Sequence, residues 1–158
     1  MNLPRRVTVV EVGPRDGLQN EKTLLPVADR LAFCNRLLEA GLPVVEVGAF
    51  VSPRAVPQMA GSDEVVRRVT RSIRTRTPVL VPNRQGFEAA RAAGAREIAV
   101  FTAASESFNR HNINAGIEES FARFTEFVPQ ALAEGMWVRV YISTCLGCPY
   151  EGAVDPAK

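Results

Sequence analysis

The most constraining feature of this sequence is the regular alternation of short apolar runs with longer amphipathic segments. The apolar runs are rich in β-branched residues and almost uninterrupted, which is typical of strands in a parallel sheet that is covered on both faces. Strands that alternate with helices in this way form parallel sheets with right-handed crossovers. We therefore predict an α/β fold with about five parallel strands, at Val7–Val12, Val44–Phe50, Val79–Val81, Glu97–Thr102 and Val138–Ser143.

Four segments between the predicted strands have helical patterns. Gly41 can end the first helix, Ser62 and Asn83 can cap the second and third, and Pro129 implies a kink or break in the fourth. The predicted helices are Pro26–Ala40, Asp63–Ile73, Gly86–Ala93 and Ile117–Glu134.

Two architectures use this order of elements, an open doubly wound sheet and a (β/α)8 barrel. A complete barrel needs about 250 residues, whereas this chain has 158 residues. The length predicts a single domain, and no repeat or low-complexity linker divides it. From the pattern alone, both architectures stay open.

Composition bears on the class of partner. The net charge of +2 is too small to favour nucleic-acid binding, and no apolar run is long enough to cross a membrane. Three cysteines, an odd and small number, suit a reducing compartment. The segment Met1–Arg6 is too short and polar for a signal peptide. We predict a cytoplasmic protein that binds neither nucleic acid nor membranes. One basic cluster is interpreted as a solvated face: Arg67, Arg68, Arg71, Arg74 and Arg76.

Polar side chains follow the predicted strands, where the functional loops of both architectures lie. Arg15, Asp16 and Gln19 come directly after the first strand, and polar loops follow the fourth and fifth strands. A carboxylate such as Asp16 suits Mg²⁺ or Mn²⁺, and a fixed guanidinium such as Arg15 can stabilise a carboxylate or a developing enolate oxygen. A solvated surface turn explains the same residues, so both interpretations stay open.

Glu46 interrupts an apolar run that should be buried. A buried carboxylate needs a partner or a metal ion, and Arg15 at the end of the neighbouring strand is the obvious candidate. The pair could be part of a site, or an ion pair that only ties two strands together.

The single histidine and the cysteines limit the chemistry further. His111 is the only histidine, so a histidine-rich metal site cannot be completed within these residues. Cys145 and Cys148 have the spacing of a redox or zinc motif, but the absence of a second pair argues against zinc, and the following proline argues against a thioredoxin-like motif. Cys34 lies on the apolar face of the first predicted helix and is expected in the core. Glycine fingerprints for phosphates or dinucleotides are absent.

Five stretches of the sequence, in order, closely resemble the 3-hydroxy-3-methylglutaryl-CoA lyases, which belong to a metal-dependent superfamily of lyases and synthases built on TIM barrels. The related Claisen-type synthases share the Arg-Asp-Gly-x-Gln core, whereas the longer GPRDGLQNE and GCPYEG stretches resemble the lyases. The resemblance implies the N-terminal portion of a (β/α)8 barrel. Residues 1–158 are then expected to form an incomplete barrel that ends after the fifth strand. The five stretches are VEVGPRDGLQNEK, EVGAFVSPRAVPQM, TPVLVPNRQGFEAA, FTAASESFNRHNIN and CLGCPYEG.

The resemblance also implies a reaction, the retro-Claisen cleavage of 3-hydroxy-3-methylglutaryl-CoA to acetyl-CoA and acetoacetate. By that resemblance Asp16 is a ligand of the divalent cation, Mg²⁺ or Mn²⁺, and Arg15 stabilises the enolate of the departing acetyl-CoA. Glu46 matches the acidic residue near that arginine, and Gln19 a polar neighbour of the site.

Three further residues are assigned to the acyl-CoA substrate by the same resemblance. Asn112 and Tyr141 match positions that line the acyl-CoA pocket, and Lys22 is implied to contact a phosphate of CoA. The family's two histidine ligands, an asparagine ligand and a catalytic cysteine belong to later strands and have no match here. We therefore expect the 158 residues alone to be inactive, and the complete enzyme to be a homodimer.

Two alternatives remain beside the lyase. The chain could be a natural half-barrel that acts as a binding or assembly module, because open sheet edges invite pairing with another copy. It could also belong to a related 3-hydroxy-acyl-CoA lyase or Claisen synthase.

Overall fold

The computed structural model describes residues 4–155 and 157. In this described part, every pair of neighbouring strands is parallel, and the strand order is β1-β2 in one sheet and β3-β4-β5-β6 in the other. The predicted α/β fold with parallel strands is confirmed. The strands are β1 (Val10–Glu11), β2 (Val44–Val45), β3 (Gly48–Ala49), β4 (Val79–Leu80), β5 (Glu97–Ala103) and β6 (Trp137–Ser143).

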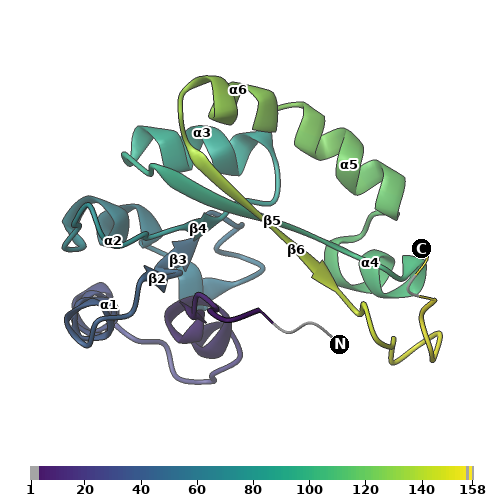
Figure 1. The fold of residues 1–158 in the computed structure, drawn as a ribbon. Helices are drawn as coiled ribbons and strands as arrows, with labels where there is room; N and C mark the ends of the chain where they lie inside the picture. The colour runs from purple at the N-terminus through teal and green to yellow at the C-terminus, as the bar shows by residue number, and fades with distance from the viewer. Residues whose placement is uncertain (1–3, 156, 158) are drawn as a thin grey trace.

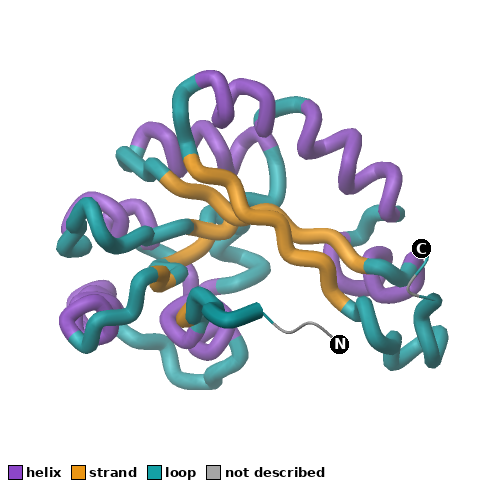
Figure 2. The backbone as a smooth tube through the Cα atoms, viewed as in Figure 1, coloured by secondary structure: helices purple, strands orange, loops and turns teal. Residues whose placement is uncertain are grey.

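The helices lie along one curved outer side of the strands, where α1, α2 and α3 are followed by α6, α5 and then α4 (Figure 1). Figure 2 shows the strands on the inner side of this arc. This is the layered arrangement that repeated βα units produce. The helices are α1 (Val27–Glu39), α2 (Ser62–Arg68), α3 (Arg84–Ala92), α4 (Glu106–Ile113), α5 (Ile117–Thr125) and α6 (Val128–Ala133), with two short helical turns, η1 (Gly13–Gly17) and η2 (Pro57–Met59).

The predicted strand Val44–Phe50 divides into β2 and β3, yet it links both sheets. The backbone N–H of Glu46 donates to the carbonyl of Glu11 at 2.8 Å on one side, and that of Val47 donates to Pro78 at 3.0 Å on the other. Alternate backbone groups therefore pair with opposite neighbours. The segment 44–49 acts as one central run between β1 and β4.

Several sequence predictions for the helices are confirmed. Gly41 follows α1 with φ of +90°, and Asn83 caps α3 by accepting a hydrogen bond from the Gly86 N–H at 2.9 Å. The fourth predicted helix is broken into α5 and α6, and Pro129 lies in the first turn of α6, where a missing N–H costs least.

Helix α2 differs from its prediction at both ends. Gly61, in the left-handed region at φ of +74°, precedes the helix, and Ser62 lies inside it with its side chain buried. The helix ends at Arg68 instead of Ile73, because Val69 turns to an extended conformation and packs into the core.

The segment after β5, read as a loop from its polar sequence, contains α4. Ser105 caps this helix, because its Oγ accepts a hydrogen bond from the Phe108 N–H at 3.2 Å. The first strand is shorter than predicted, since Val7 and Val9 are exposed and lie before β1.

The main core lies between the strands and the helical layer. Val45 and Val47 are buried in this core, so Glu46 between them points to the opposite side of the strands. Cys34 is fully buried in the same core, as predicted. A smaller cluster that includes Leu80 and Ala99 packs on the inner side. In the described residues, no helix has the length and apolar character needed to span a membrane.

Candidate active site

The charged turn after β1 is η1, a single wide helical turn. The carbonyl of Val12 accepts hydrogen bonds from the backbone N–H groups of Arg15 at 3.0 Å, Asp16 at 2.7 Å and Gly17 at 3.3 Å. Pro14 is buried beneath the turn. The turn therefore has a fixed backbone, and it presents Arg15 and Asp16 side by side at the carboxyl end of the strand.

Arg15 and Glu46 form a buried ion pair. The Nε of Arg15 donates to Oε1 of Glu46, whose side chain is fully buried, while the Arg15 side chain is 12% exposed. The other carboxylate oxygen, Oε2, accepts a hydrogen bond from the Tyr141 hydroxyl at 2.6 Å. Glu46 thus connects the first strand to β6, and the predicted pairing of Glu46 with Arg15 is confirmed.

Tyr141 keeps its proton in this arrangement. Burial, followed by its hydrogen bond to the Glu46 carboxylate, raises the pKa of the Tyr141 hydroxyl far above its ordinary value. The guanidinium of Arg139 lies over the Tyr141 ring, 4.8 Å from the ring centroid. Tyr141 is therefore a fixed hydrogen-bond donor.

The Arg15 guanidinium retains donor capacity. Its Nη1 donates to Oδ1 of Asp16 at 2.7 Å, and its Nη2 donates to none of the described residues. The carboxylates of Glu46 and Asp16 fix the orientation of the guanidinium through its Nε and Nη1. Its Nη2 edge is available to a further acceptor. Such an edge suits an anionic oxygen on a bound molecule.

Asp16 is the residue of this site that fits a divalent cation. Its side chain is 53% exposed, and among residues 4–155 and 157 only its Oδ1 is paired, with Arg15. The buried Glu46 carboxylate uses both oxygens for Arg15 and Tyr141. Across the described residues, no group of three or more His, Cys, Asp or Glu side chains could hold a metal ion. The donor set of the described residues therefore fits one ligand of a hard cation.

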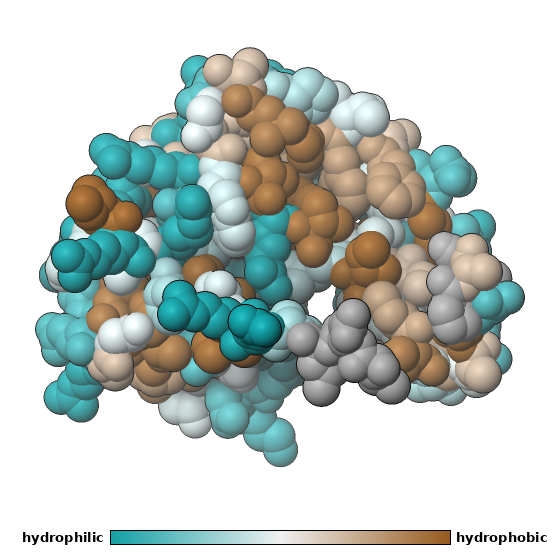
Figure 3. Space-filling model, viewed as in Figure 1, coloured by the Kyte–Doolittle hydropathy of each residue, from teal (hydrophilic) through white to brown (hydrophobic). Residues whose placement is uncertain are grey.

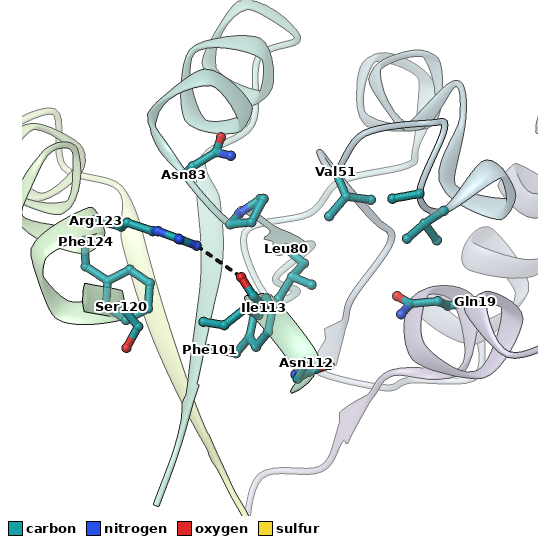
Figure 4. A pocket seen from close by; sticks show the side chains of 13 residues that line it. Gln19, Val51, Leu80, Asn83, Phe101, Asn112, Ile113, Ser120, Arg123 and Phe124 are labelled. Atoms are coloured by element: carbon teal, nitrogen blue, oxygen red, sulfur yellow. Dashed lines mark hydrogen bonds between the residues drawn. The ribbon is translucent and has the colours of Figure 1, made fainter. Parts of the chain in front are cut away.

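We call the cluster of Arg15, Asp16, Glu46 and Tyr141 the catalytic corner. A cavity of about 280 Å³ lies beside it, between the loops that follow β3 and β4 and the helices α4 and α5. Figure 4 shows Gln19 on one side of it and Asn112 between Gln19 and Arg123. Arg123 donates to the carbonyl of Ile113 at 3.3 Å and so ties α5 to the end of α4. The lining is partly apolar, with Val51, Leu80, Phe101 and Phe124 among its side chains.

The seven predicted site residues fall into three groups. Arg15, Asp16, Glu46 and Tyr141 are joined by hydrogen bonds. The cavity is lined by Gln19 and Asn112, and by none of those four. Lys22 is exposed on the loop before α1, outside the cavity lining.

A second buried network supports the inner end of β3. Arg30, 1% exposed, donates to the Ala60 carbonyl at 2.6 Å and to Ser62 Oγ at 3.0 Å. The Ser62 hydroxyl also accepts from the Ala49 N–H at 3.2 Å and donates to the Met59 carbonyl at 2.7 Å. This network anchors the loop between β3 and α2, part of which borders the cavity.

Arg139 and the helix that carries Asn112 were not predicted from the sequence. Arg139 and Tyr141 are two residues apart in β6, and the period of two places both on one face of the strand. That alternation was a usable signal. For α4, the usable signal was Ser105 three residues before Phe108, in the pattern of an N-cap.

The comparisons with known proteins agree with this geometry. The HMGL-like family profile matches residues 6–158. A mitochondrial hydroxymethylglutaryl-CoA lyase of Rattus norvegicus is 53% identical over 156 residues, covering 99% of this chain and 48% of the rat protein. A cytoplasmic 3-hydroxy-3-methylglutaryl-CoA lyase of Mus musculus is 54% identical over 156 residues, covering 99% of this chain and 46% of the mouse protein.

A solved structure is equally similar. The crystal structure of hydroxymethylglutaryl-CoA lyase from Pseudomonas aeruginosa superposes with a TM-score of 0.93 at 52% identity, over 99% of this chain and 52% of that one. The chain therefore spans about half the length of the relatives that it matches. The fold, the order of the motifs and the matched residues lead to one conclusion: the chain belongs to the HMGL-like family, whose fold is a TIM barrel.

Proposed function

We propose that this chain supplies the first catalytic corner of a hydroxymethylglutaryl-CoA lyase, which cleaves 3-hydroxy-3-methylglutaryl-CoA to acetyl-CoA and acetoacetate. The observation that carries the proposal is the fixed Arg15 guanidinium, held by Glu46 and Asp16, whose Nη2 donates to no residue in the described part of the chain. The names of the rat, mouse and Pseudomonas aeruginosa relatives support the reaction and its acyl-CoA substrate.

Arg15 would act on the charge that the reaction creates. Cleavage of the carbon–carbon bond leaves an electron pair on the carbon next to the thioester, and this pair delocalises onto the thioester oxygen as an enolate. A positioned guanidinium stabilises that oxygen more strongly in the transition state than in the substrate. Glu46 would orient Arg15, and the Tyr141 hydroxyl would hold Glu46 in place through its 2.6 Å hydrogen bond.

Asp16 would hold the divalent cation, Mg²⁺ or Mn²⁺. Its half-exposed carboxylate has one oxygen free to bind a hard cation. When bound, such a cation supplies Lewis-acid polarisation of substrate oxygens. Arg15 lies next to this cation site, because its Nη1 donates to Asp16 Oδ1 at 2.7 Å. Both groups would therefore contact the same substrate.

The cavity beside this corner would receive the acyl-CoA. Gln19 and Asn112 offer amide groups in a partly apolar lining, which suits the acyl part of the substrate. Lys22, exposed on the loop before α1, would contact a phosphate of CoA. We further propose that residues 1–158 form one partial barrel, that the complete enzyme is a homodimer, and that it works in the cytoplasm, as the name of the mouse relative places that protein.

The test is a chimera that joins residues 1–158 to the remaining half of the Pseudomonas aeruginosa lyase. We expect it to release acetyl-CoA from 3-hydroxy-3-methylglutaryl-CoA, and Arg15→Gln to lower kcat by about 100-fold or more with little change in KM. Arg67→Gln, at an exposed arginine paired with Asp63, is the matched control and should keep full activity.

Two results would contradict the proposal. A change confined to KM in Arg15→Gln would remove the transition-state role of Arg15. A chimera that cleaves other substrates in a panel of 3-hydroxy-acyl-CoA and 2-oxoacid compounds, but not this one, would point to a related lyase or Claisen synthase.

A second candidate function is an assembly module formed from half-barrels. Val140 and Ile142 of β6 are more than half exposed, and apolar side chains gather over β6 in Figure 3. Such a strand face invites another copy. Light scattering of the chain separates the candidates: a stable dimer supports the module, and a monomer or undefined aggregates contradict it.

A further inference from the structure

The loop after β6, residues 144–152, packs against helix α4. The backbone N–H of Ser107 donates to Glu151 Oε1 at 2.7 Å. The Tyr150 ring stacks on His111, with ring centroids 4.3 Å apart. These contacts fasten the loop to the helix that carries Asn112, one of the residues that line the cavity.

Cys148 is the buried attachment point of this loop. Its Sγ accepts hydrogen bonds from the Ser105 hydroxyl at 2.9 Å and from the Tyr150 N–H at 3.4 Å, and the side chain is only 6% exposed. Ser105 is also the N-cap of α4. The sulfur is therefore surrounded by donors, the environment that stabilises a thiolate.

The acidity of this thiol agrees with its surroundings. Burial and the nearby Glu151 carboxylate oppose ionisation of Cys148, but hydrogen bonds from Ser105 and from the backbone N–H groups of Tyr150 and Glu151 outweigh them and lower the pKa of the thiol below its ordinary value. Cys34 shows the opposite case, because burial raises its thiol pKa to about 11.

Cys145 is the accessible partner of Cys148. It is exposed, as are Leu146 and Gly147 between the two cysteines, and the backbone bends at Cys145 and Leu146. A four-residue stretch can close as a β-turn with its ends within about 7 Å, which is the reach of a disulfide. Thr144, just before, has φ of +61°, a left-handed conformation that is unfavourable for a β-branched residue.

We propose that Cys145 and Cys148 are a redox modification site, which a low-molecular-weight disulfide such as oxidised glutathione converts to an intramolecular disulfide. Cys145 is the entry thiol because it is exposed, and Cys148 is the resolving thiol because its sulfur is held by donors near the loop backbone. Neither cysteine is assigned a part in the cleavage reaction above.

The reaction proceeds by two thiol–disulfide exchanges. The Cys145 thiolate attacks one sulfur of the small disulfide, an S–S bond to Cys145 forms, and one small thiolate leaves. The Cys148 thiolate then attacks the Cys145 sulfur and expels the second small thiolate. In total, the two cysteines lose two electrons and two protons, and the small disulfide is reduced to two thiols.

Closing the disulfide would move the loop away from α4. The Cys148 sulfur must leave its Ser105 donor to reach Cys145, and the bond between the Ser107 N–H and Glu151 lies in the same interface. Oxidation therefore loosens the attachment of the helix that presents Asn112 to the cavity.

The test is mass spectrometry of the folded chain after incubation with oxidised glutathione. We expect a loss of two hydrogens that maps to Cys145 and Cys148, with Cys34 still reduced. Cys148→Ser should accumulate a glutathione adduct on Cys145, and Cys145→Ser should stay unmodified.

Hydrogen–deuterium exchange gives an independent measurement on the same samples. Oxidation of the wild-type chain should increase exchange of amides in 105–113, and the Cys145→Ser chain should show no such change. A persistent glutathione adduct on wild-type Cys145, a disulfide that includes Cys34, or no oxidation would each overturn the proposal.

Discussion

Glu46 is the residue on which the candidate site depends. Its carboxylate is fully buried and accepts hydrogen bonds from Arg15 of the first βα turn and from Tyr141 of β6. A buried carboxylate is tolerated only when its charge and lone pairs are satisfied. The hydrogen bonds from Arg15 and Tyr141 compensate the burial of the Glu46 charge. The same bonds fix the positions of these two side chains, which would contact the substrate.

Replacing Glu46 by glutamine should destabilise the chain strongly. Glu46→Gln keeps the shape but leaves the nearly buried Arg15 cation without its main counter-charge, a loss of about 3 kcal/mol in the free energy of unfolding. The control is Glu64→Gln, which breaks an exposed pair with Arg68 and should cost no more than about 0.5 kcal/mol. Urea unfolding of both variants measures the difference, and equal losses would remove the special status of Glu46.

Cys34 should make stability depend on alkaline pH. Burial, opposed in part by Arg30, raises the pKa of the Cys34 thiol from 9.0 to about 11 in the folded chain. The folded state therefore holds this proton more tightly, so its contribution is complete below pH 9.0 and is lost as the pH rises to about 11.

The expected loss is about 3 kcal/mol, from a two-unit shift at about 1.4 kcal/mol per unit. Chemical unfolding at several pH values should show this fall in the wild-type chain and a flatter profile in Cys34→Ala. Parallel profiles in the two chains would refute it.

For single residues, the sequence was most informative where a charged side chain occurs in a run that should be buried. A charge in an apolar run predicted that Glu46 needs a partner, and Arg15 is that partner. The partner of the second oxygen, Tyr141, is 95 positions away in sequence. No local pattern encodes a contact at such a separation, because it depends on which strands lie opposite each other.

Strand β3 has a strict packing requirement at Gly48. A Cβ at Gly48 would lie 2.6 Å from Ser62 Oγ, and that hydroxyl is held by bonds to Arg30, Ala49 and Met59. The serine cannot move without breaking its network. Glycine at this position therefore allows α2 to approach the strand closely.

Gly48→Ala should lower the free energy of unfolding by about 1 to 3 kcal/mol, the usual cost of overpacking. Gly17→Ala is the matched control, because a Cβ there would have no atom within 4 Å. Thermal unfolding of both variants gives the comparison. If Gly48→Ala were as stable as the control, the Ser62 network would be adaptable and not rigid.

Strands and helices were predicted correctly where the apolar pattern was long. The predictions were wrong where capping or tertiary packing determined the end of a helix. The strands that became β4, β5 and β6 were placed by their runs of valines and isoleucines, which are buried in β4 and β5 but partly exposed in β6. Helix α4 escaped notice because its exposed face is polar and its mean composition resembles a loop. The end of α2 was misplaced because the burial of Val69, a tertiary effect, overrides helix propensity.

For the molecule as a whole, the family and the parallel α/β fold were predictable because several motifs occur in order. The role of Asp16 as a metal ligand stays a prediction, because the described residues bring a single suitable carboxylate to the site. The cavity was not predictable. It depends on how α4 and α5 pack beside the loop after β3.

The chain by itself should bind Mg²⁺ weakly and show no lyase turnover. One half-exposed carboxylate predicts a Kd above about 1 mM, the weak end of protein sites for such cations. Isothermal titration with MgCl₂, and an assay for acetyl-CoA release, measure both properties, and Asp16→Asn should abolish any residual heat of binding. Micromolar affinity or measurable cleavage would show that the chain completes the site by itself.

The long separation between Glu46 and Tyr141 has a kinetic consequence. The contact joins residues 95 positions apart, so it can form only after the intervening βα units have come together. During synthesis, Arg15 and Glu46 leave the ribosome long before Tyr141 does. Glu46 therefore lacks its second hydrogen-bond donor until β6 has docked, and formation of the Tyr141–Glu46 hydrogen bond reports that docking.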